Sequence, residues 1–112
     1  MALDYAWEKL SASVSTLTEG TGTIQQRLRD AYSQFMRLQA EDLPPVLWAK
    51  YTAIDQQLTR IPAAGDEGTL MATTSVMSDE EARQIASDMF WLYDAVARLY
   101  GEEQPYEVGE GR

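Results

Sequence analysis

The strongest constraint on the fold is an apolar spacing that recurs in four stretches of the chain. In each stretch, apolar residues follow one another at alternating steps of four and three positions. The four sets are Leu3, Trp7, Leu10, Val14 and Leu17; Ile24, Leu28, Ala31, Phe35 and Leu38; Leu47, Tyr51, Ile54, Leu58 and Ile61; and Ile85, Met89, Leu92, Val96 and Leu99. This spacing places each set along one side of an α-helix. Its average of about 3.5 residues suits helices that pack at shallow crossing angles.

Residues typical of helix ends flank these stretches. Thr23 with Gln26, and Ser78 with Glu81, have the spacing of a capping box, in which each side chain binds the backbone amide of the other residue. Gly101 follows the last apolar position, where a glycine commonly ends a helix. Together these signals predict helices at about 4–18, 23–40, 44–61 and 78–100.

We therefore expect an all-α fold, a compact antiparallel four-helix bundle that forms a single domain over residues 1–101. Short connections between the first three helices favour antiparallel neighbours. The alternative is a pair of helical hairpins that complete their cores by homodimerisation. Residues 62–77 form a longer connection, which fits either a short helical turn or a strap across the end of the bundle. Residues 102–112 have the composition of a flexible acidic tail.

The stretch TEGTGTIQQRL, residues 18–28, places two glycines between the first two expected helices. A phosphate-binding loop of the Walker type follows a strand and ends in lysine and then serine or threonine. Here the glycines follow a helix, no lysine comes after them, and Glu19 adds negative charge. We therefore interpret the stretch as a corner between helices, in which Gly20 adopts a positive φ and Thr23 caps the second helix.

The chain contains no cysteine and no histidine. It therefore has no thiol nucleophile, no imidazole base and none of the usual ligands of zinc or haem. Most carboxylates lie off the apolar stripes, where solvent-facing positions are expected. We predict no enzyme activity, no catalytic residue, no metal site and no bound cofactor.

The net charge is −9, and most of it lies in the second part of the chain. Residues 66–112 hold eleven acidic and three basic residues, whereas residues 1–65 hold seven and six. Nucleic-acid phosphates repel such a chain, and it lacks the basic amphipathic stretch that binds anionic membranes. Its first residues show no signal-peptide pattern, and no apolar run reaches the roughly 18 residues of a membrane span. We expect a cytoplasmic protein that binds neither nucleic acid nor membranes directly.

The last expected helix is more aromatic than one buried stripe requires. Beside that stripe it carries Phe90, Trp91, Tyr93 and Tyr100, and Trp48 flanks the stripe of the third helix. Aromatic residues bury a large area with few rotatable bonds and are enriched at interfaces. The leading hypothesis is a non-enzymatic protein-binding module (a regulator, adaptor or inhibitor) that presents these residues, with an acidic surround, to a protein partner or to another copy of itself. The simpler interpretation is a central helix that contacts two neighbours.

Two other functions stay open on the sequence alone. The first is an acidic inhibitor that imitates phosphate charge and blocks a basic groove of a partner protein. It requires one exposed row of six acidic residues, which are Asp79, Glu80, Glu81, Asp88, Glu102 and Glu103. The second is a small-molecule site or enzyme inside the helical bundle, which requires a buried pocket with converging polar groups.

Overall fold

The computed structural model describes residues 2–63, 65 and 68–103, and this part of the chain is helical with no strand. Its elements are α1 (Asp4–Glu19), α2 (Ile24–Phe35), the 3₁₀ helix η1 (Ala40–Asp42), α3 (Pro45–Leu58), α4 (Gly68–Ser75) and α5 (Asp79–Glu103). The all-α prediction is therefore confirmed. The four-helix bundle is not confirmed, because the described residues form five α-helices.

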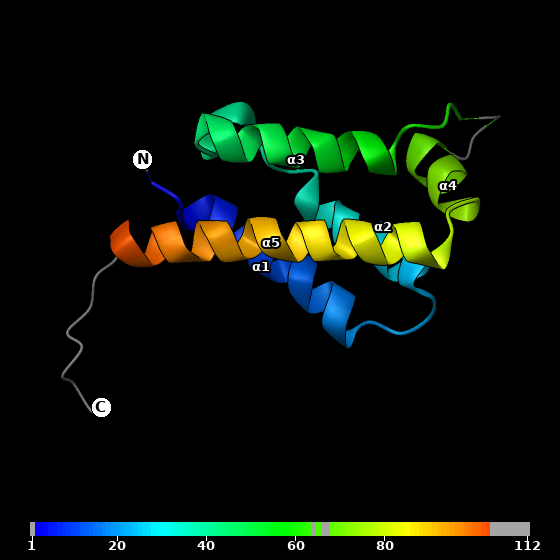
Figure 1. The fold of residues 1–112 in the computed structure, drawn as a ribbon, viewed down its shortest axis with the longest axis horizontal. Coiled ribbons are helices and arrows are strands. Elements are labelled where there is room, and N and C mark those ends of the chain that lie inside the picture. Colours follow the sequence, from blue (N-terminus) through cyan, green and yellow to red (C-terminus); the bar gives the residue numbers. More distant parts are fainter. Residues whose placement is uncertain (1, 64, 66–67, 104–112) are drawn as a thin grey trace.

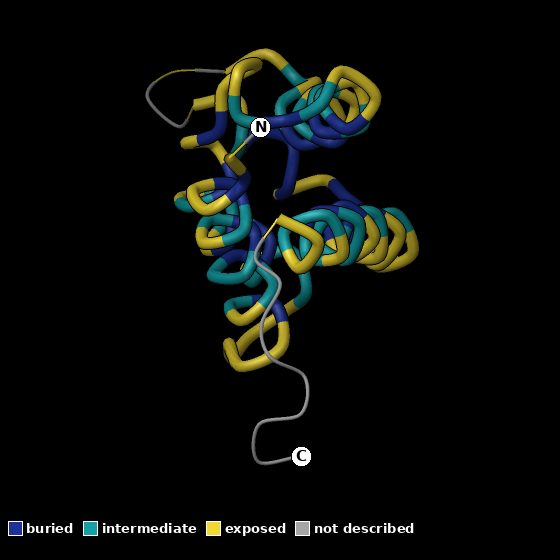
Figure 2. The backbone as a smooth tube through the Cα atoms, turned by 90° about the vertical axis from the view of Figure 1, so that its left-hand side faces the viewer, coloured by how far each residue is buried: buried dark blue, intermediate teal, exposed yellow. Residues whose placement is uncertain are grey.

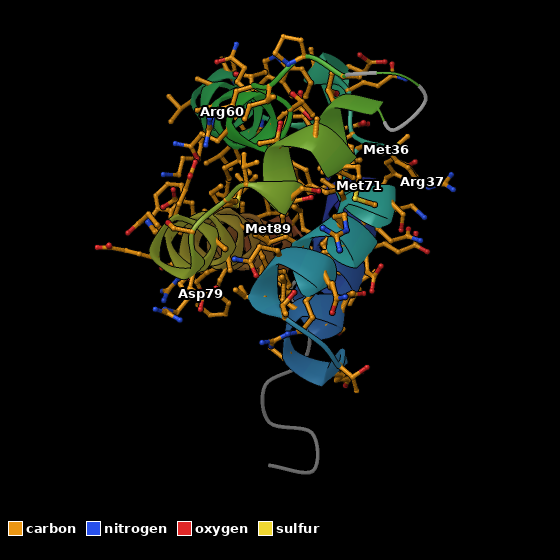
Figure 3. The ribbon with its side chains drawn as sticks, turned by 90° about the vertical axis from the view of Figure 1, so that its right-hand side faces the viewer. Met36, Arg37, Arg60, Met71, Asp79 and Met89 are labelled. Atoms are coloured by element: carbon orange, nitrogen blue, oxygen red, sulfur yellow. The ribbon has the colours of Figure 1, made fainter. Side chains whose placement is uncertain are left out.

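Helix α5 is the longest helix of the described residues, and it packs against α1, α2 and α3 (Figure 1). Its inward side consists of Ala82, Ile85, Met89, Leu92 and Val96, each no more than 1% exposed. Figure 3 shows Met89 on the side of α5 that faces the other helices. These residues belong to one core cluster to which the stripes of α1, α2 and α3 also contribute. Because that core closes within one chain, the stripes need no second copy to cover them.

Neighbouring long helices run in opposite directions. Lys9, near the start of α1, donates a hydrogen bond to Gln34, near the end of α2, at 3.3 Å. Arg60, just after α3, pairs with Glu81, near the start of α5, at 3.0 Å. The short connection between α1 and α2 thus joins antiparallel neighbours, as its length predicts, and α3 and α5 are antiparallel although the longer connection with α4 lies between them.

Aromatic rings join α2 to α3. The ring of Tyr51 lies 4.4 Å from that of Phe35 and 4.8 Å from that of Trp48, measured between centroids. The Tyr51 hydroxyl donates to the Phe35 carbonyl at 2.8 Å, and the Tyr32 hydroxyl donates to Asp55 at 2.5 Å. Burial raises the pKa of both tyrosines well above the usual range, and the negative charge of Asp55 adds to the shift. Both phenols therefore stay neutral donors at physiological pH.

The corner between α1 and α2 contains the predicted capping box. The Thr23 hydroxyl accepts from the Gln26 amide at 3.1 Å, and the Gln26 side chain accepts from the Thr23 amide at 2.9 Å. The positive φ lies at Gly22 (92°) and not at Gly20, which is extended. Gly22 is needed there because a Cβ would also stand 2.1 Å from the Gln26 side-chain oxygen.

Helix α2 ends at Phe35, earlier than the predicted boundary near residue 40. The carboxylate of Asp42 accepts from the Gln39 amide at 2.8 Å and starts the separate 3₁₀ turn η1. Such local bonds between side chain and backbone compete with continuation of an α-helix. Leu38 is still only 4% exposed, so the apolar stripe extends beyond the helix that it was used to predict.

The connection predicted at residues 62–77 contains a helix, α4, which packs against α2 and α3 at one end of the molecule (Figure 1). Its buried residues are Ala72, Thr73 and Thr74. The Thr73 hydroxyl accepts from the Ile61 amide at 3.0 Å, and the Thr74 hydroxyl accepts from Arg29 at 2.9 Å. Threonines therefore occupy most of the buried positions, and α4 shows no apolar stripe.

Helix α5 continues past Gly101 to Glu103, so the predicted glycine terminus near residue 100 is wrong. A carboxylate oxygen of Glu103 accepts from the Leu3 amide at 2.9 Å and ties the end of α5 to the start of α1. Glu102 and Glu103, the first two residues of the expected tail, belong to this helix. The other tail residues, 104–112, lie outside the described residues.

Candidate functional site

The outer side of α5 is the candidate site. Figure 1 shows α5 along one side of the molecule with no other helix in front of it, and Figure 2 shows exposed positions along its outer edge. Opposite the buried row, this side presents Arg83, Ser87, Phe90, Trp91 and Arg98, all exposed. A helix buried on one side and aromatic on the other offers a surface for a partner.

Phe90 and Trp91 are 53% and 52% exposed, which is unusual for side chains of this size. The Phe90 ring lies 6.0 Å from that of Tyr93. Tyr93 is two turns from Tyr100, and Tyr100 stacks on Trp7 of α1 with 5.2 Å between the ring centroids. Phe90 therefore lies toward the α1 edge of the exposed side.

Trp91 lies toward the opposite edge, beside α3. The Lys50 ammonium of α3 is 5.4 Å from the centroid of the Trp91 ring and 3.5 Å from a carboxylate oxygen of Asp88. Gln84 donates to the same Asp88 oxygen at 3.0 Å. A cation over an indole face is attracted by the ring quadrupole, so Lys50 helps to orient Trp91. Half of the indole still faces solvent.

The other three predicted aromatic contacts are partly buried in the fold. Tyr93 and Tyr100 pack against the core, and Trp48 stacks on Tyr51. The structure therefore divides the five aromatic candidates between two roles. Phe90 and Trp91 are accessible to a partner, whereas the other three mainly hold α1 and α3 in place.

The six acidic candidates turn toward different neighbours. Asp79 accepts from Gln25 of α2 at 2.9 Å. Glu81 pairs with Arg60 after α3, and Figure 3 shows Arg60 above the start of α5, where Asp79 is labelled. Asp88 binds Lys50 of α3, as described above, and Glu103 binds the start of α1.

The remaining two acidic candidates, Glu80 and Glu102, are exposed. Hydrogen bonds or ion pairs within the chain therefore engage four of the six acidic candidates, on at least three different sides of α5.

A surface pocket of about 420 Å³ lies between the starts of α2 and α5, next to the former phosphate-loop candidate. Its lining includes Thr23, Arg27, Asp79 and Arg83. Arg27 Nη1 donates to the Leu17 carbonyl at 2.9 Å. That bond satisfies a carbonyl in the last turn of α1, where the backbone carbonyls have no amide donor within the helix. Capping therefore accounts for this corner.

Comparison with known proteins does not identify the site: no family model, no curated protein and no solved structure matches the chain. Within residues 2–63, 65 and 68–103, no three acidic side chains group as a metal ion would require. In the same part of the chain, no helix is both long enough and apolar enough to cross a bilayer. The geometry of α5 is therefore the basis for assigning a function.

Three charged residues accompany Phe90 on the outer side of α5 and were not among the predicted site residues. These are Arg83, Asp94 and Arg98, which recur at steps of eleven and four residues. The signal was present in the sequence, as a second series with helical spacing opposite the apolar stripe. Aromatic and acidic residues alone do not reveal this series, because two of its members are arginines.

Proposed function

We propose that the protein is a non-enzymatic protein-binding module that acts through the outer side of α5. The observation that carries this proposal is the exposure of Phe90 and Trp91, which are consecutive residues near the middle of a helix whose opposite side is fully buried. Burial of apolar surface releases about 25 cal/mol per Å², so two half-exposed aromatic rings favour association.

The surroundings of the two rings support the same function. Lys50 contacts the Trp91 ring, and Tyr93 contacts the Phe90 ring. Because these contacts already restrict both rings, ordering them on binding costs little additional conformational entropy. On the same side of α5, Arg83 lies two turns before the rings and Arg98 lies two turns after them. Interfaces commonly combine an apolar centre with a charged rim, which contributes orientation more than affinity.

The two alternative functions have less support. Phosphate mimicry needs a continuous acidic row, whereas four of the six acidic candidates are bound to groups on or next to α1, α2 and α3. A small-molecule site needs a buried pocket with converging polar groups, whereas three pockets among the described residues are open to solvent.

The test is affinity capture with the double variant Phe90→Ser/Trp91→Ser. Since both rings are half exposed, the variant should keep the helical content and the melting temperature close to those of the wild type. We expect wild-type protein to retain a specific partner, or itself, and the variant to lose at least about 90% of that binding, as expected for aromatic anchors.

The matched control is Met36→Ser/Met71→Ser. These methionines are also exposed, and Figure 3 shows them on the side of the molecule away from the outer side of α5. The control should bind as the wild type does. Equal binding by the wild type and by Phe90→Ser/Trp91→Ser would contradict the proposal.

A further inference from the structure

The outer side of α5 carries a charge pattern that is complementary to itself. Along this side the residues follow one another at steps of three or four: Asp79, Arg83, Ser87, Phe90, Asp94 and Arg98. Such spacing places all six along one side of the helix, away from the buried row, with Asp79 at the edge next to α2. Arg83 and Arg98 are the two basic residues of 68–103, and both lie here. The four charged residues of this strip sum to zero on an otherwise acidic chain, and the exposed Glu80 borders the strip at its start.

The charges of the strip are accessible to a partner, and Asp79 is exposed although it also accepts from Gln25 of α2. Within the described chain, Arg83 has no hydrogen-bond or ion-pair partner. Asp94 pairs with Arg98 at 2.9 Å, one turn away, but the two side chains are still 43% and 77% exposed. One carboxylate can accept from two guanidinium groups, so Asp94 can bind a second arginine without losing Arg98.

We propose that the partner is a second copy of this chain, bound through α5 packed antiparallel against the α5 of that copy. This inference rests on the proposed function, because it uses the same surface. A two-fold axis between positions 88 and 89 places Arg83 opposite the partner's Asp94, and Asp79 opposite the partner's Arg98. The symmetry repeats each pair, so four pairs of opposite charges border the interface.

The same axis also fits the shapes at the centre. Ser87 lies opposite the partner's Phe90, so each large ring meets a small side chain. Trp91 flanks this centre on both copies and can cover it from the edge. The result is an aromatic centre within a rim of paired charges, the usual arrangement of a protein interface.

Other arrangements of the two helices set like charges against each other. A parallel pair places Arg83 opposite the partner's Arg83 and Asp94 opposite the partner's Asp94. An antiparallel pair with its axis between positions 90 and 91 brings Phe90 and Trp91 together, but it places Arg83 opposite Arg98. Moving the axis to lie between positions 86 and 87 places Asp79 opposite Asp94. Since like charges at an interface are costly, the charge pattern selects one register.

The dimer should be weak and reversible. One exposed helix face is smaller than the roughly 800 Å² per partner of a standard interface, and two chains of charge −9 repel each other elsewhere. We expect a dissociation constant in the micromolar range, on the order of 10 to 100 μM, as is common for small transient interfaces.

Sedimentation of the full chain over a concentration series tests this directly. Arg83→Glu and Asp94→Arg should each raise the dissociation constant at least about tenfold, because each sets like charges opposite each other at two symmetric places. Combining them in one chain restores opposite charges in reversed order. The double variant Arg83→Glu/Asp94→Arg should therefore dimerise within about threefold of the wild type, provided that circular dichroism shows it to be folded.

The control for net charge is Arg37→Glu, an exposed arginine after α2 whose reversal changes the charge of the chain by the same amount as Arg83→Glu. It should leave dimerisation nearly unchanged. A dimer that survives both Arg83→Glu and Phe90→Ser/Trp91→Ser uses another surface and overturns the proposal.

A wild-type chain that stays monomeric up to about 1 mM, well above the expected dissociation constant, also overturns it. In that case, capture of another protein that depends on Phe90 and Trp91 would leave the proposed function standing. If the wild-type chain stays monomeric and also captures no protein through Phe90 and Trp91, the proposed function is rejected as well.

Discussion

Hydroxyl side chains satisfy the backbone at several points where helices end or meet. Ser13 is fully buried in α1, with its hydroxyl 2.9 Å from the Lys9 carbonyl and 3.3 Å from the Ala31 carbonyl of α2. Thr73 of α4 accepts from the Ile61 amide that follows α3. Buried polar groups are stable only when paired, so these residues hold neighbouring segments in fixed positions.

Thr23→Ala tests the clearest of these hydroxyl contacts. The substitution leaves the Gln26 amide without its acceptor at the first turn of α2, and it should lower the free energy of unfolding by about 1 kcal/mol. Urea denaturation followed by circular dichroism measures the change. Thr21→Ala is the control, since Thr21 is exposed in the same corner and makes no cap. An equal effect of both substitutions would mean that the cap contributes little.

Among the elements, the four long helices were predictable because each buries one apolar stripe. The helix α4 was not predicted as a full helix, because two threonines satisfied by Ile61 and Arg29 fill its buried positions. The apolar pattern also did not predict the early end of α2, because that end depends on the bond from the Gln39 amide to Asp42. Apolar periodicity detects burial, and it does not detect hydrogen bonds between side chain and backbone.

The contact between α2 and α3 should make the protein sensitive to alkaline pH. Burial raises the pKa of Tyr32 and Tyr51 in the folded state, whereas an unfolded tyrosine has a pKa of about 10. Below pH 10 the stabilisation is fully present, because both states keep the protons. Above it the unfolded chain loses protons that the folded chain retains, so the free energy of unfolding falls.

Urea denaturation at pH 8 and at pH 11 measures this dependence. The variant Tyr32→Phe/Tyr51→Phe should be less stable at pH 8, because the hydrogen bonds to Asp55 and to the Phe35 carbonyl are lost. It should lose less of its stability between the two pH values than the wild type does. Deprotonation of the lysines affects both proteins alike, so the difference reports the tyrosines. Parallel losses would contradict the assignment.

In the whole molecule, α5 is both the centre of the core and the outer surface of the candidate site. The sequence predicted the inner role from the stripe Ile85 to Leu99, and it indicated the outer role through Phe90 and Trp91. It did not separate those two residues from Tyr93, Tyr100 and Trp48. That distinction depends on the positions of α1 and α3, which only the packing of distant segments determines.

A cavity at the centre of α5 should therefore destabilise the entire protein. Leu92 is fully buried, and Leu92→Ala should lower the free energy of unfolding by about 2–5 kcal/mol. Far-ultraviolet and near-ultraviolet circular dichroism should report the same midpoint, as expected for one cooperative unit. Phe90→Ala, on the exposed side of the same helix, should change stability by less than about 0.5 kcal/mol. Two separate transitions in Leu92→Ala would show that the α1–α2 pair folds alone.

The position of α5 in the chain also affects how the protein is made. A ribosome adds roughly 5–20 residues per second, so the 25 residues of α5 take about 1–5 s to synthesise. During that interval the apolar stripes of α1, α2 and α3 are already present, while the helix that covers them is missing. The contact between Leu3 and Glu103 joins residues 100 positions apart and can form only after all of α5 has been synthesised. A nascent chain halted before α5 should therefore expose its core and become a substrate for chaperones.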